Sequence, residues 1–385
     1  MQATQYDYIF LGAGCASLSI IMRMINSGKF TDKKILLIDK EGKTKNDRTW
    51  CFWEKEPGFF EEIIHKKWDH LLFKTDDDTI PLKISPYRYK MIRGLDFYNY
   101  CFSSIELQKN IDIIYGNIST GEESVSRIKI NDEILEVKNE AVIFNSIYEK
   151  LEKDKDKFYL LQHFKGWIVE TPTERFNADE AVLMDFRVSQ QHGTTFAYVL
   201  PLSPTKALIE YTLFTEKILA QPEYDNALKN YIEKFLKLAS YRIIDEEFGI
   251  IPMTNATFPR KRNGIYNIGT AGGQTKASTG YTFRFIQKQA DSIVKELAVG
   301  KNYSKTNKEH SRFYFYDSTL LHILSKKLLS GKIIFSILFK KNKAEKVLKF
   351  LDNESSVSDE IKLLNTLPKR VFIKAGFQEF IKIIF

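Results

Sequence analysis

The sequence of 385 residues predicts an α/β protein, in which a unit of parallel strands is interrupted by mainly antiparallel strands and followed by a helical C-terminal region. Three observations predict this fold class. The first forty residues contain two buried strands with a helix between them, residues 158–214 alternate with the two-residue period of strands, and the lysine-rich tail from residue 301 onward has helical spacing. A chain of this length usually folds as more than one compact unit.

The N-terminal unit consists of a strand at residues 6–11 (YDYIFL), a helix at 15–26 (CASLSIIMRMIN) and a second strand at 34–39 (KILLID). Gly12 permits a tight turn after the first strand, and Gly14 lets the backbone approach a pyrophosphate at the helix N-terminus. This arrangement indicates a dinucleotide site, although such a turn also occurs in α/β proteins that bind no ligand. The residues expected to form the site are Gly12, Ala13, Gly14, Ala16, Ser17 and Asp39.

Two of these residues carry further information, one on helix packing and the other on the choice of ligand. Ser17 replaces the third glycine of the usual pattern and is small enough for the helix to pack closely on the sheet. Asp39 ends the second strand and can accept hydrogen bonds from a ribose. An acid rather than an arginine at position 39 favours an adenosine with a free 2′-hydroxyl, as in FAD or NAD.

The middle of the chain is predicted to be mostly strand. Residues 75–89 are polar and turn-rich with strand-like pieces, residues 158–214 contain a hairpin signal at 201–204, and residues 222–239 form an amphipathic helix. A strand at 266–269 then leads into a second glycine-rich turn and a helix at 279–299.

This second turn, GTAGG at 269–273 followed by TGY at 279–281, resembles the second flavin fingerprint of the hydroxylase-type FAD fold. Thr270 stands where the broad fingerprint usually carries an acid, so the match is to a subgroup. The resemblance favours FAD over NAD, because an NAD-only enzyme does not need this segment. It implies cofactor contacts from Gly269, Gly272, Gly273, Gly280 and Tyr281.

We therefore predict a Rossmann-like FAD-binding domain of the hydroxylase type with an inserted, mainly antiparallel β substrate domain. The parts of the FAD-binding domain are expected at 1–60, 96–157 and 246–300, the substrate-domain strands at 61–95 and 158–245, and the helical C-terminal region at 301–385.

Several kinds of site and partner are not expected. Three cysteines form no CxxC pair and six histidines have no ligand-like spacing, so we expect neither a disulfide framework nor a metal site. The same cysteine usage predicts that the protein works in the reducing cytoplasm. The N-terminus lacks the basic leader and apolar core of a signal peptide. No apolar run reaches the length of about 18 residues that a transmembrane helix requires.

Six further motifs together resemble the signatures of bacterial lycopene β-cyclases, in family order over about residues 5–300. One departure is Asn145-Ser146, where family members often carry an acid. The motifs are DRTWCFW (47–53), QHFKGW (162–167), MDFR (184–187), FAYVLP (196–201), LIEYT (208–212) and GTAGGQTKASTGYTF (269–283).

The resemblance implies that the protein cyclises the ψ-ends of lycopene, or of a related acyclic carotenoid, to β-ionone rings, giving β-carotene via γ-carotene. This reaction is an isomerisation with no net redox change. The resemblance also implies that FAD acts in its reduced form, and that NADPH or NADH supplies the electrons.

Glu210 is the expected catalytic acid. In a strand over 206–214, Leu208, Glu210, Thr212 and Phe214 share one face, so the carboxyl has apolar neighbours that raise its pKa and keep it protonated. The family's essential acidic residue lies in the matching Leu-Ile-Glu-x-Thr segment, and the resemblance carries that role to Glu210. The alternative is an ordinary solvent-facing strand glutamate.

Other residues are candidates for the pocket around the reacting carotenoid end. Aromatic faces can stabilise a carbocation without attacking it, although each aromatic residue could equally belong to the core. Asp185 could be a second acid or base, but a structural pair with Arg187 is favoured; Arg48 and Arg93 could contact the cofactor. The predicted pocket residues are Trp50, Phe52, Trp53, Trp167, Asp185 and Glu247.

The formal net charge of +8 is concentrated in one segment, since residues 325–350 contain eight lysines against the single acid Glu345. Because a carotenoid dissolves in the bilayer, we expect this basic and oily segment to contact an anionic membrane, with the protein peripherally associated from the cytoplasm. The alternative is an amphipathic helix on the core with a solvated lysine face. Nucleic acid is not an expected partner.

Two other functions remain open from the sequence. A flavin-dependent isoprenoid reductase or hydroxylase could share this fold, and would consume reducing equivalents or oxygen in each turnover. A non-catalytic protein that binds flavin or docks on a membrane would be insensitive to the change Glu210→Gln.

Overall fold

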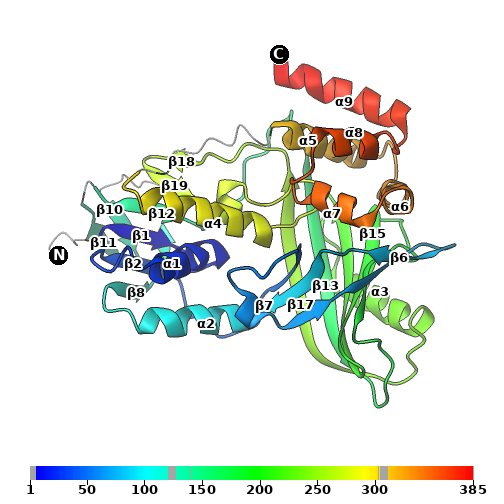
Figure 1. The fold of residues 1–385 in the computed structure, drawn as a ribbon, viewed down its shortest axis with the longest axis horizontal. Coiled ribbons are helices and arrows are strands. Elements are labelled where there is room, and N and C mark those ends of the chain that lie inside the picture. Colours follow the sequence, from blue (N-terminus) through cyan, green and yellow to red (C-terminus); the bar gives the residue numbers. More distant parts are fainter. Residues whose placement is uncertain (1–5, 120–126, 139, 302, 304–310, 385) are drawn as a thin grey trace.

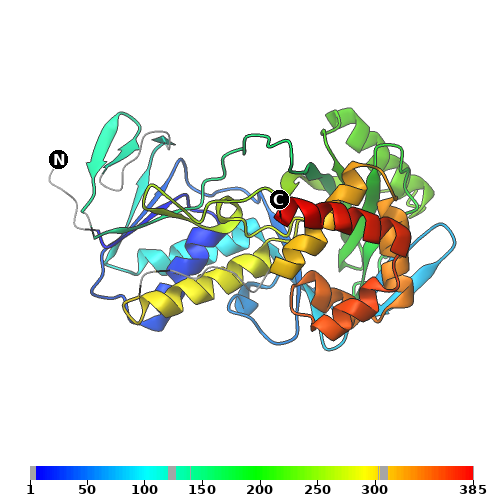
Figure 2. The ribbon, with the colours of Figure 1, turned by 90° about the horizontal axis from the view of Figure 1, so that it is seen from above.

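The computed structural model of the protein describes residues 6–384 except 120–126, 139, 302 and 304–310. In this part of the chain a parallel sheet with its helices occupies one end of the molecule, and a larger, mainly antiparallel sheet occupies the other (Figure 1). A cluster of C-terminal helices lies over the half of the molecule that holds the larger sheet, as the view from above also shows (Figure 2).

The parallel sheet has the strand order β18-β19-β12-β1-β2-β8, in which only the pair β18–β19 is antiparallel. Its strands are β1 (Tyr8–Leu11), β2 (Ile35–Asp39), β8 (Ile111–Tyr115), β12 (Val142–Asn145), β18 (Lys261–Arg262) and β19 (Ile265–Asn267). Helices cover one face, and a small antiparallel sheet supplies apolar side chains to the core on the other. The covering elements are α1 (Cys15–Ser27), α2 (Gly94–Glu106), α4 (Phe283–Leu297), β9 (Ile118–Ser119), β10 (Arg127–Ile130) and β11 (Glu133–Glu136).

The larger sheet has the order β17-β13-β16-β15-β14-β5-β6 and is antiparallel except between β14 and β5. Its strands are β5 (His70–Lys74), β6 (Thr79–Lys83), β13 (Tyr159–Glu170), β14 (Glu180–Asp185), β15 (Thr194–Ser203), β16 (Lys206–Thr215) and β17 (Arg242–Thr254). A third sheet, β3-β7-β4, lies between this sheet and α2. It comprises β3 (Thr49–Glu54), β4 (Lys66–Trp68) and β7 (Arg88–Arg93), with the 3-10 turn η1 (Glu61–Ile63) before β4.

Strand alternation gives the larger sheet two different faces. One face carries Ile209, Tyr211 and Leu213 of β16, which pack against helix α3 (Gln221–Lys234). The opposite face carries Leu208 and Phe214, which belong to the core shared with the C-terminal helices. Those helices are α5 (Ser311–Ser325), α6 (Gly331–Lys341), α7 (Ala344–Leu351), α8 (Val357–Leu364) and α9 (Lys369–Ile384).

The predicted fold class is confirmed: a parallel α/β unit, a mainly antiparallel sheet and a helical C-terminal region are all present. Some element ends differ from the prediction. Helix α3 ends at Lys234, and Lys237 then takes a left-handed conformation with φ 54° that stops the helical pattern. Helix α4 begins at Phe283 rather than 279, because Gly280 has φ 74°. The expected domain boundary at 245/246 falls inside β17, which pairs with β13 up to Thr254.

The structure does not show the membrane contact expected of residues 325–350, and most of this segment packs on the protein. Most of its apolar side chains, including Ile334, Phe335 and Leu348, are buried in the core against the larger sheet, whereas Leu328 and Ile333 are exposed. Three of its lysines pair with acids: Lys332 with Asp76, Lys340 with Asp78 and Lys346 with Asp359. This packing agrees with the alternative of an amphipathic segment on the core with lysines on its solvated side. Among the described residues, no helix has the length and apolar character needed to cross a membrane.

Candidate functional site

A large cavity of about 930 Å³ joins the glycine-rich turn after β1 to the face of the larger sheet that carries Glu210. One end is lined by Gly14, Ala16 and Arg48, and the other by Glu210 and Glu247. A single continuous space therefore connects the predicted dinucleotide turn with the predicted acid.

Glu210 belongs to a row of four residues that cross the sheet side by side. Tyr198 of β15 lies opposite Glu210 of β16, Glu210 lies opposite Gly166 of β13, and Gly166 lies opposite Glu247 of β17. Directly opposed residues share a face of the sheet, so the row places the two glutamates on the same face with only a glycine between them.

Gly166 is the reason that the two carboxyl groups can meet. A Cβ atom at this position would lie 3.0 Å from Glu247 Cγ and 3.2 Å from Glu247 Oε1. With no side chain on the central strand, Glu247 leans over β13 and its carboxyl interacts with that of Glu210. Each carboxyl also accepts a hydrogen bond from a threonine: Thr212 Oγ1 donates to Glu210 Oε1 at 2.5 Å, and Thr49 Oγ1 donates to Glu247 Oε2 at 2.5 Å.

The electrostatics of the pair favour one shared proton. Burial and the neighbouring Glu247 raise the pKa of Glu210 well above its ordinary value. Burial also raises the pKa of Glu247, while the Thr49 hydrogen bond opposes this. Two carboxyls in contact cannot both ionise without strong repulsion. Because the pKa of Glu210 is raised further above its ordinary range, Glu210 is the carboxyl of the pair that retains a proton more readily.

Phenol groups surround the acid on its other side. Tyr281 exchanges hydrogen bonds with the hydroxyls of Tyr89 and Tyr198, and all three line the cavity. Burial raises the pKa of each of these tyrosines, so they remain neutral. Trp50 and Phe164 add aromatic faces to the same wall. Apart from the Glu247 carboxyl, the polar neighbours of Glu210 are thus neutral hydroxyls, and the remaining surroundings are mostly apolar.

At the other end of the cavity, the turn after β1 has the geometry that a phosphate needs. Gly12 has φ 89°, and a Cβ there would lie 2.6 Å from Ser146 Oγ. The first turn of α1 has no side-chain cap, so its N–H groups are not occupied by one. Asp39 accepts hydrogen bonds from Ala13 N at 2.6 Å and from Lys43 Nζ at 3.0 Å, which holds the turn against the end of β2.

The second glycine-rich segment touches the first. It forms the 3-10 turn η2 (Gly269–Gly272), and a Cβ on Gly269, whose φ is 59°, would lie 2.7 Å from Ala16 Cβ. The oxygens Gln162 Oε1 and Thr279 Oγ1 are buried beside the cavity without a hydrogen-bond partner. Unpartnered buried polar atoms are costly, so this wall is suited to a polar ligand group.

Several predicted site residues line the cavity directly: Gly14, Ala16, Arg48, Trp50, Glu210, Glu247, Gly269, Gly280 and Tyr281. Gly12, Ala13, Ser17 and Asp39 lie just behind the first turn, where Ser17 Oγ donates to Ser146 Oγ at 3.1 Å. Gly272 and Gly273 shape the second turn, with Gly273 at φ 74° over Phe258. Arg93 instead forms an ion pair with Asp96 at 2.7 Å.

Four predicted pocket residues do not line this cavity. Trp167 and Asp185 lie on the opposite face of the sheet, under α3, because each is offset by one residue from the face that carries Glu210. Asp185 is bound by Arg187 and by Tyr231 of α3, the structural pairing that the sequence favoured. Phe52 stacks on Phe283 beside a smaller, separate cavity. Trp53 is buried edge-on to Tyr281.

Sequence reasoning missed Gly166, Tyr198 and Thr49 as parts of the site. Gly166 and Tyr198 do lie in quoted motifs, but nothing local shows that they oppose Glu210. A glycine inside a strand pattern is a signal for a close approach, and at Gly166 this signal was available. In the described ranges no group of three or more histidine, cysteine, aspartate or glutamate side chains could hold a metal ion.

The family model described as lycopene cyclase protein matches residues 7–375. The lycopene beta-cyclase of Pantoea ananas is 26% identical over 301 residues, which cover 75% of this chain and 74% of that protein. The chloroplastic neoxanthin synthase of Solanum tuberosum is 23% identical over 320 residues, covering 76% of this chain and 61% of that protein.

Solved structures share the fold at low identity. A geranylgeranyl bacteriochlorophyll reductase-like protein from Thermoplasma acidophilum has a TM-score of 0.59 at 14% identity, covering 96% of this chain and 98% of its own. A flavoprotein/dehydrogenase from Cytophaga hutchinsonii has a TM-score of 0.62 at 10% identity, covering 98% of this chain and 100% of its own. These likenesses show a fold that a flavoprotein also adopts.

Proposed function

The chain belongs to the lycopene cyclase family, as its motifs predicted, and we propose that it is a lycopene β-cyclase. It would convert the ψ-ends of lycopene, or of a related acyclic carotenoid, to β-ionone rings, giving β-carotene via γ-carotene. In each ring closure one proton enters at the terminal double bond, one carbon–carbon bond forms and a different proton leaves. Atoms and electrons balance without an oxidant or a reductant.

The observation that carries this proposal is the carboxyl pair of Glu210 and Glu247 across Gly166. Protonating an alkene requires an acid that is still protonated at neutral pH, and the raised pKa of Glu210 supplies one. The cavity lies in front of this carboxyl and is walled by apolar and aromatic side chains that would keep water from the carbocation.

Glu247 is our candidate for the base. Its Oε1 is buried without a hydrogen-bond partner, while Thr49 holds Oε2. After one ring closure, Glu210 has lost a proton and Glu247 has gained one. Because the two carboxyls interact directly, a proton passing between them restores the starting state. No proton exchange with solvent is needed before the second end reacts.

The carbocation itself would be stabilised by the aromatic wall. Trp50, Phe164 and Tyr198 line the cavity, and a desolvated aromatic face contributes about 0.5–2 kcal/mol to a nearby cation. None of these groups is a strong nucleophile, so none would trap the cation as an adduct.

FAD fits the other end of the cavity. Gly12, Gly14 and the uncapped start of α1 would hold the pyrophosphate, and Asp39 the adenosine ribose. The segment from Gly269 to Gly280, with the unpartnered oxygens of Gln162 and Thr279, would face the flavin. Bound in reduced form, FAD would supply negative charge beside the pocket, with NADPH or NADH as its electron donor.

The direct test is expression in cells that accumulate lycopene. The unchanged protein should give cyclic carotenoids on chromatography, and Glu210→Gln should abolish β-ring formation while the purified protein retains its flavin absorbance. The matched control is Glu246→Gln, because Glu246 lies on the other face of β17 and pairs with Lys165. It should leave the product unchanged. β-Carotene from the Glu210→Gln variant would remove Glu210 from the mechanism.

An assay of the purified protein that counts NADPH and oxygen consumed per product separates the rival functions. A cyclase turns over many substrate molecules for each reducing equivalent, whereas an isoprenoid reductase consumes one NADPH per product and a hydroxylase consumes oxygen. Stoichiometric loss of NADPH or oxygen with the product would overturn the cyclase assignment.

A further inference from the structure

Helix α9 buries a charged residue and exposes large apolar side chains, unlike an ordinary amphipathic helix that packs on a protein. It packs against α5 through Ala375 and Glu379, which are 0% and 3% exposed. Val371 and Phe372 pack partly against the protein core, but several large apolar side chains point away from it: Ile373 is 68% exposed and Phe377 64%. A helix on a protein core normally buries its apolar stripe and exposes its charges.

The contact between α9 and α5 is made by a buried glutamate with two cationic or imidazole partners and by a close approach of the two helices. Glu379 Oε1 lies 2.7 Å from His322 Nδ1 of α5 and also accepts from Lys382 Nζ at 3.0 Å. At Gly376 a Cβ would lie 3.3 Å from Phe315 Cζ, so the two helices approach closely at this glycine. The side of α9 that faces the protein therefore combines Ala375, Gly376 and Glu379 with the partly buried Val371 and Phe372. A second apolar side of the helix stays uncovered by the protein.

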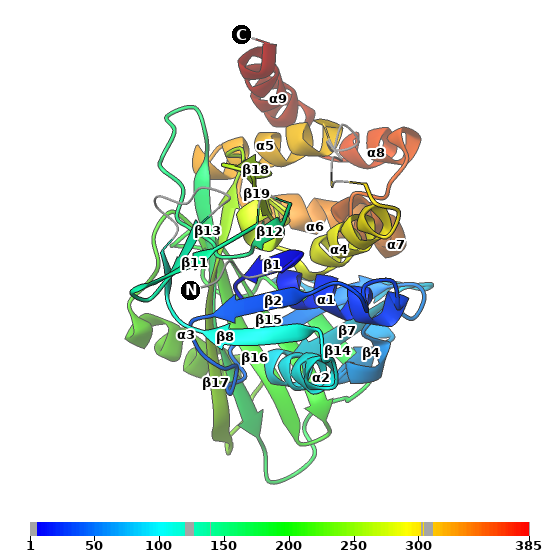
Figure 3. The same cartoon turned by 90° about the vertical axis from the view of Figure 1, so that its left-hand side faces the viewer.

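The exposed apolar residues form one stripe. Their spacing of i, i+4, i+7 and i+8 places them on a single side of the helix. The stripe consists of Ile373, Phe377, Phe380 and Ile381, all between 40% and 68% exposed. Helix α9 is also the outermost element at this end of the molecule, projecting beyond the other helices (Figure 3).

Charge identifies the kind of partner. Lys369, Arg370 and Lys374 are exposed along the first turns of α9, at or beside the borders of the stripe. The only acid between Lys369 and Lys382 is Glu379, which is buried against His322. The outer side of the helix thus combines apolar side chains with positive charge and has no negative charge of its own.

We propose that α9 is a membrane-docking helix that lies in the headgroup region of an anionic bilayer, with Ile373, Phe377, Phe380 and Ile381 in the acyl boundary. Aromatic and aliphatic side chains flanked by lysine and arginine are the composition of interfacial helices. Each basic residue near an anionic surface contributes about 1 kcal/mol to binding. The docking surface is therefore α9, and the segment 325–350 serves the core.

The position of α9 also suits delivery of an oily ligand. Lys382 Nζ of α9 lies 4.7 Å from the ring centroid of Phe158, which directly precedes β13. Leu161, Gln162 and Phe164 of the same strand line the large cavity. At about 3.3 Å per residue along a strand, the docking helix contacts the sheet about 10 Å from the cavity wall.

The test measures co-sedimentation of the full-length protein with phosphatidylcholine vesicles, with and without phosphatidylglycerol. We expect binding only to the anionic vesicles, and its loss in the double variant Phe377→Ser, Phe380→Ser. Neutralising Lys369, Arg370 and Lys374 to glutamine should weaken partitioning about 100-fold, since three residues at about 1 kcal/mol each correspond to roughly two factors of ten. All five side chains are exposed, so circular dichroism should remain unchanged.

The matched control neutralises three exposed lysines of the other segment, Lys326, Lys327 and Lys341, and should change partitioning less than twofold. Equal weakening by both triple variants, or binding that survives the phenylalanine changes, would overturn the proposal. Sedimentation equilibrium without lipid covers the remaining outcome: a dimer that the phenylalanine changes dissociate would show that a second copy covers α9. No carotenoid is present, so failure here leaves the proposed cyclisation untouched.

Discussion

At the scale of single residues, Gly166 shapes the proposed active site more than any charged group does by itself. It stands between Glu210 and Glu247 in the register of the sheet, and its lack of a side chain lets the two carboxyls interact. The raised pKa of Glu210 depends partly on that contact, after burial. A residue without functional atoms thus contributes, after burial, to the raised pKa of the proposed acid.

Gly166→Ala should therefore lower the pKa of Glu210. The added Cβ would lie 3.2 Å from Glu247 Oε1 and would push that carboxyl away, removing the repulsion that keeps Glu210 protonated. The acid is active only in its protonated form. With a lowered pKa it would lose its proton at a lower pH, so the alkaline limb of the pH–rate profile should shift to lower pH. Overpacking should also cost about 1–3 kcal/mol of stability.

A comparator separates this electrostatic effect from simple damage to the sheet. In a Glu247→Gln background the neighbouring carboxylate is already absent, so adding Gly166→Ala should not move the alkaline limb further. An alkaline limb that stays in place in the single Gly166→Ala variant would show that the two carboxyls do not communicate across β13.

Residue placements that depend on a single strand could be predicted from the sequence, whereas placements that depend on several strands could not. The face on which Glu210 lies could be predicted, because side chains alternate along one strand. Its interaction with Glu247 could not, because the two residues belong to strands that are joined only through β13. Trp167 was expected in the pocket although it neighbours Gly166 in sequence, and alternation places it on the far face.

At the scale of elements, helix α3 and the far face of the larger sheet are held together by a buried polar cluster. Asp185 is fully buried at the end of β14. Arg187 Nε donates to Asp185 Oδ1 at 2.9 Å, Arg187 Nη2 donates to Oδ2 at 2.5 Å, and Tyr231 OH of α3 donates to Oδ2 at 2.7 Å. The cluster lies on the face of the sheet that packs against α3, opposite the face that borders the cavity.

Asp185→Ala should lower stability without altering the chemistry of the folded enzyme. It leaves the Arg187 guanidinium and the Tyr231 hydroxyl without their acceptor, which costs about 3–5 kcal/mol for a buried ion pair. Urea unfolding should show an earlier midpoint, while kcat and KM of the remaining folded protein stay within about twofold. The milder Tyr231→Phe should cost about 1 kcal/mol. A fall in kcat with unchanged stability would restore Asp185 as a catalytic candidate.

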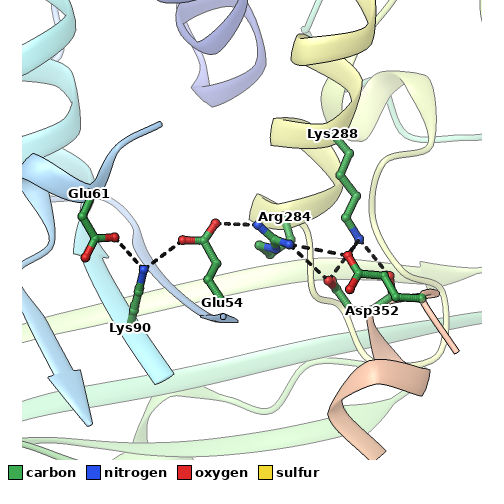
Figure 4. A network of polar contacts seen from close by, with 7 residues as sticks. Glu54, Glu61, Lys90, Arg284, Lys288 and Asp352 are labelled. Atoms are coloured by element: carbon green, nitrogen blue, oxygen red, sulfur yellow. Dashed lines mark hydrogen bonds and ion pairs between the residues drawn. The ribbon is translucent and has the colours of Figure 1, made fainter. Parts of the chain in front are cut away.

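At the scale of the whole molecule, a chain of ion pairs joins three separate parts of the fold (Figure 4). Lys90 of β7 donates to Glu54 of β3 at 3.1 Å and to Glu61 of η1 at 2.5 Å. Arg284 of α4 bridges Glu54 to Asp352, which follows α7. The small sheet, the nucleotide-side helix α4 and the C-terminal helices are thereby fixed relative to one another.

Lys90→Met should loosen this junction. The Lys90 side chain is 3% exposed and its partner Glu54 is 7% exposed. Removing the ammonium leaves Glu54 with Arg284 as its remaining cationic partner and should cost about 1–3 kcal/mol. The shift in the urea midpoint measures it. As a control, Lys295→Met breaks a pair whose side chains are 74% and 51% exposed and should cost no more than about 1 kcal/mol. Equal shifts in both variants would argue against a special role for the junction.

The sequence by itself determined the parts that depend on neighbours along the chain. These are the βαβ unit with its glycine-rich turn, the strand that carries Glu210 on an apolar face and the family motifs. Only the tertiary structure decided which strands lie side by side, and so paired Glu210 with Glu247 across Gly166. It also decided that most apolar side chains of residues 325–350 pack in the core while α9 exposes Phe377 and Phe380. The physical reason is that period and propensity act within one element, whereas register and burial are set by closure of the whole chain.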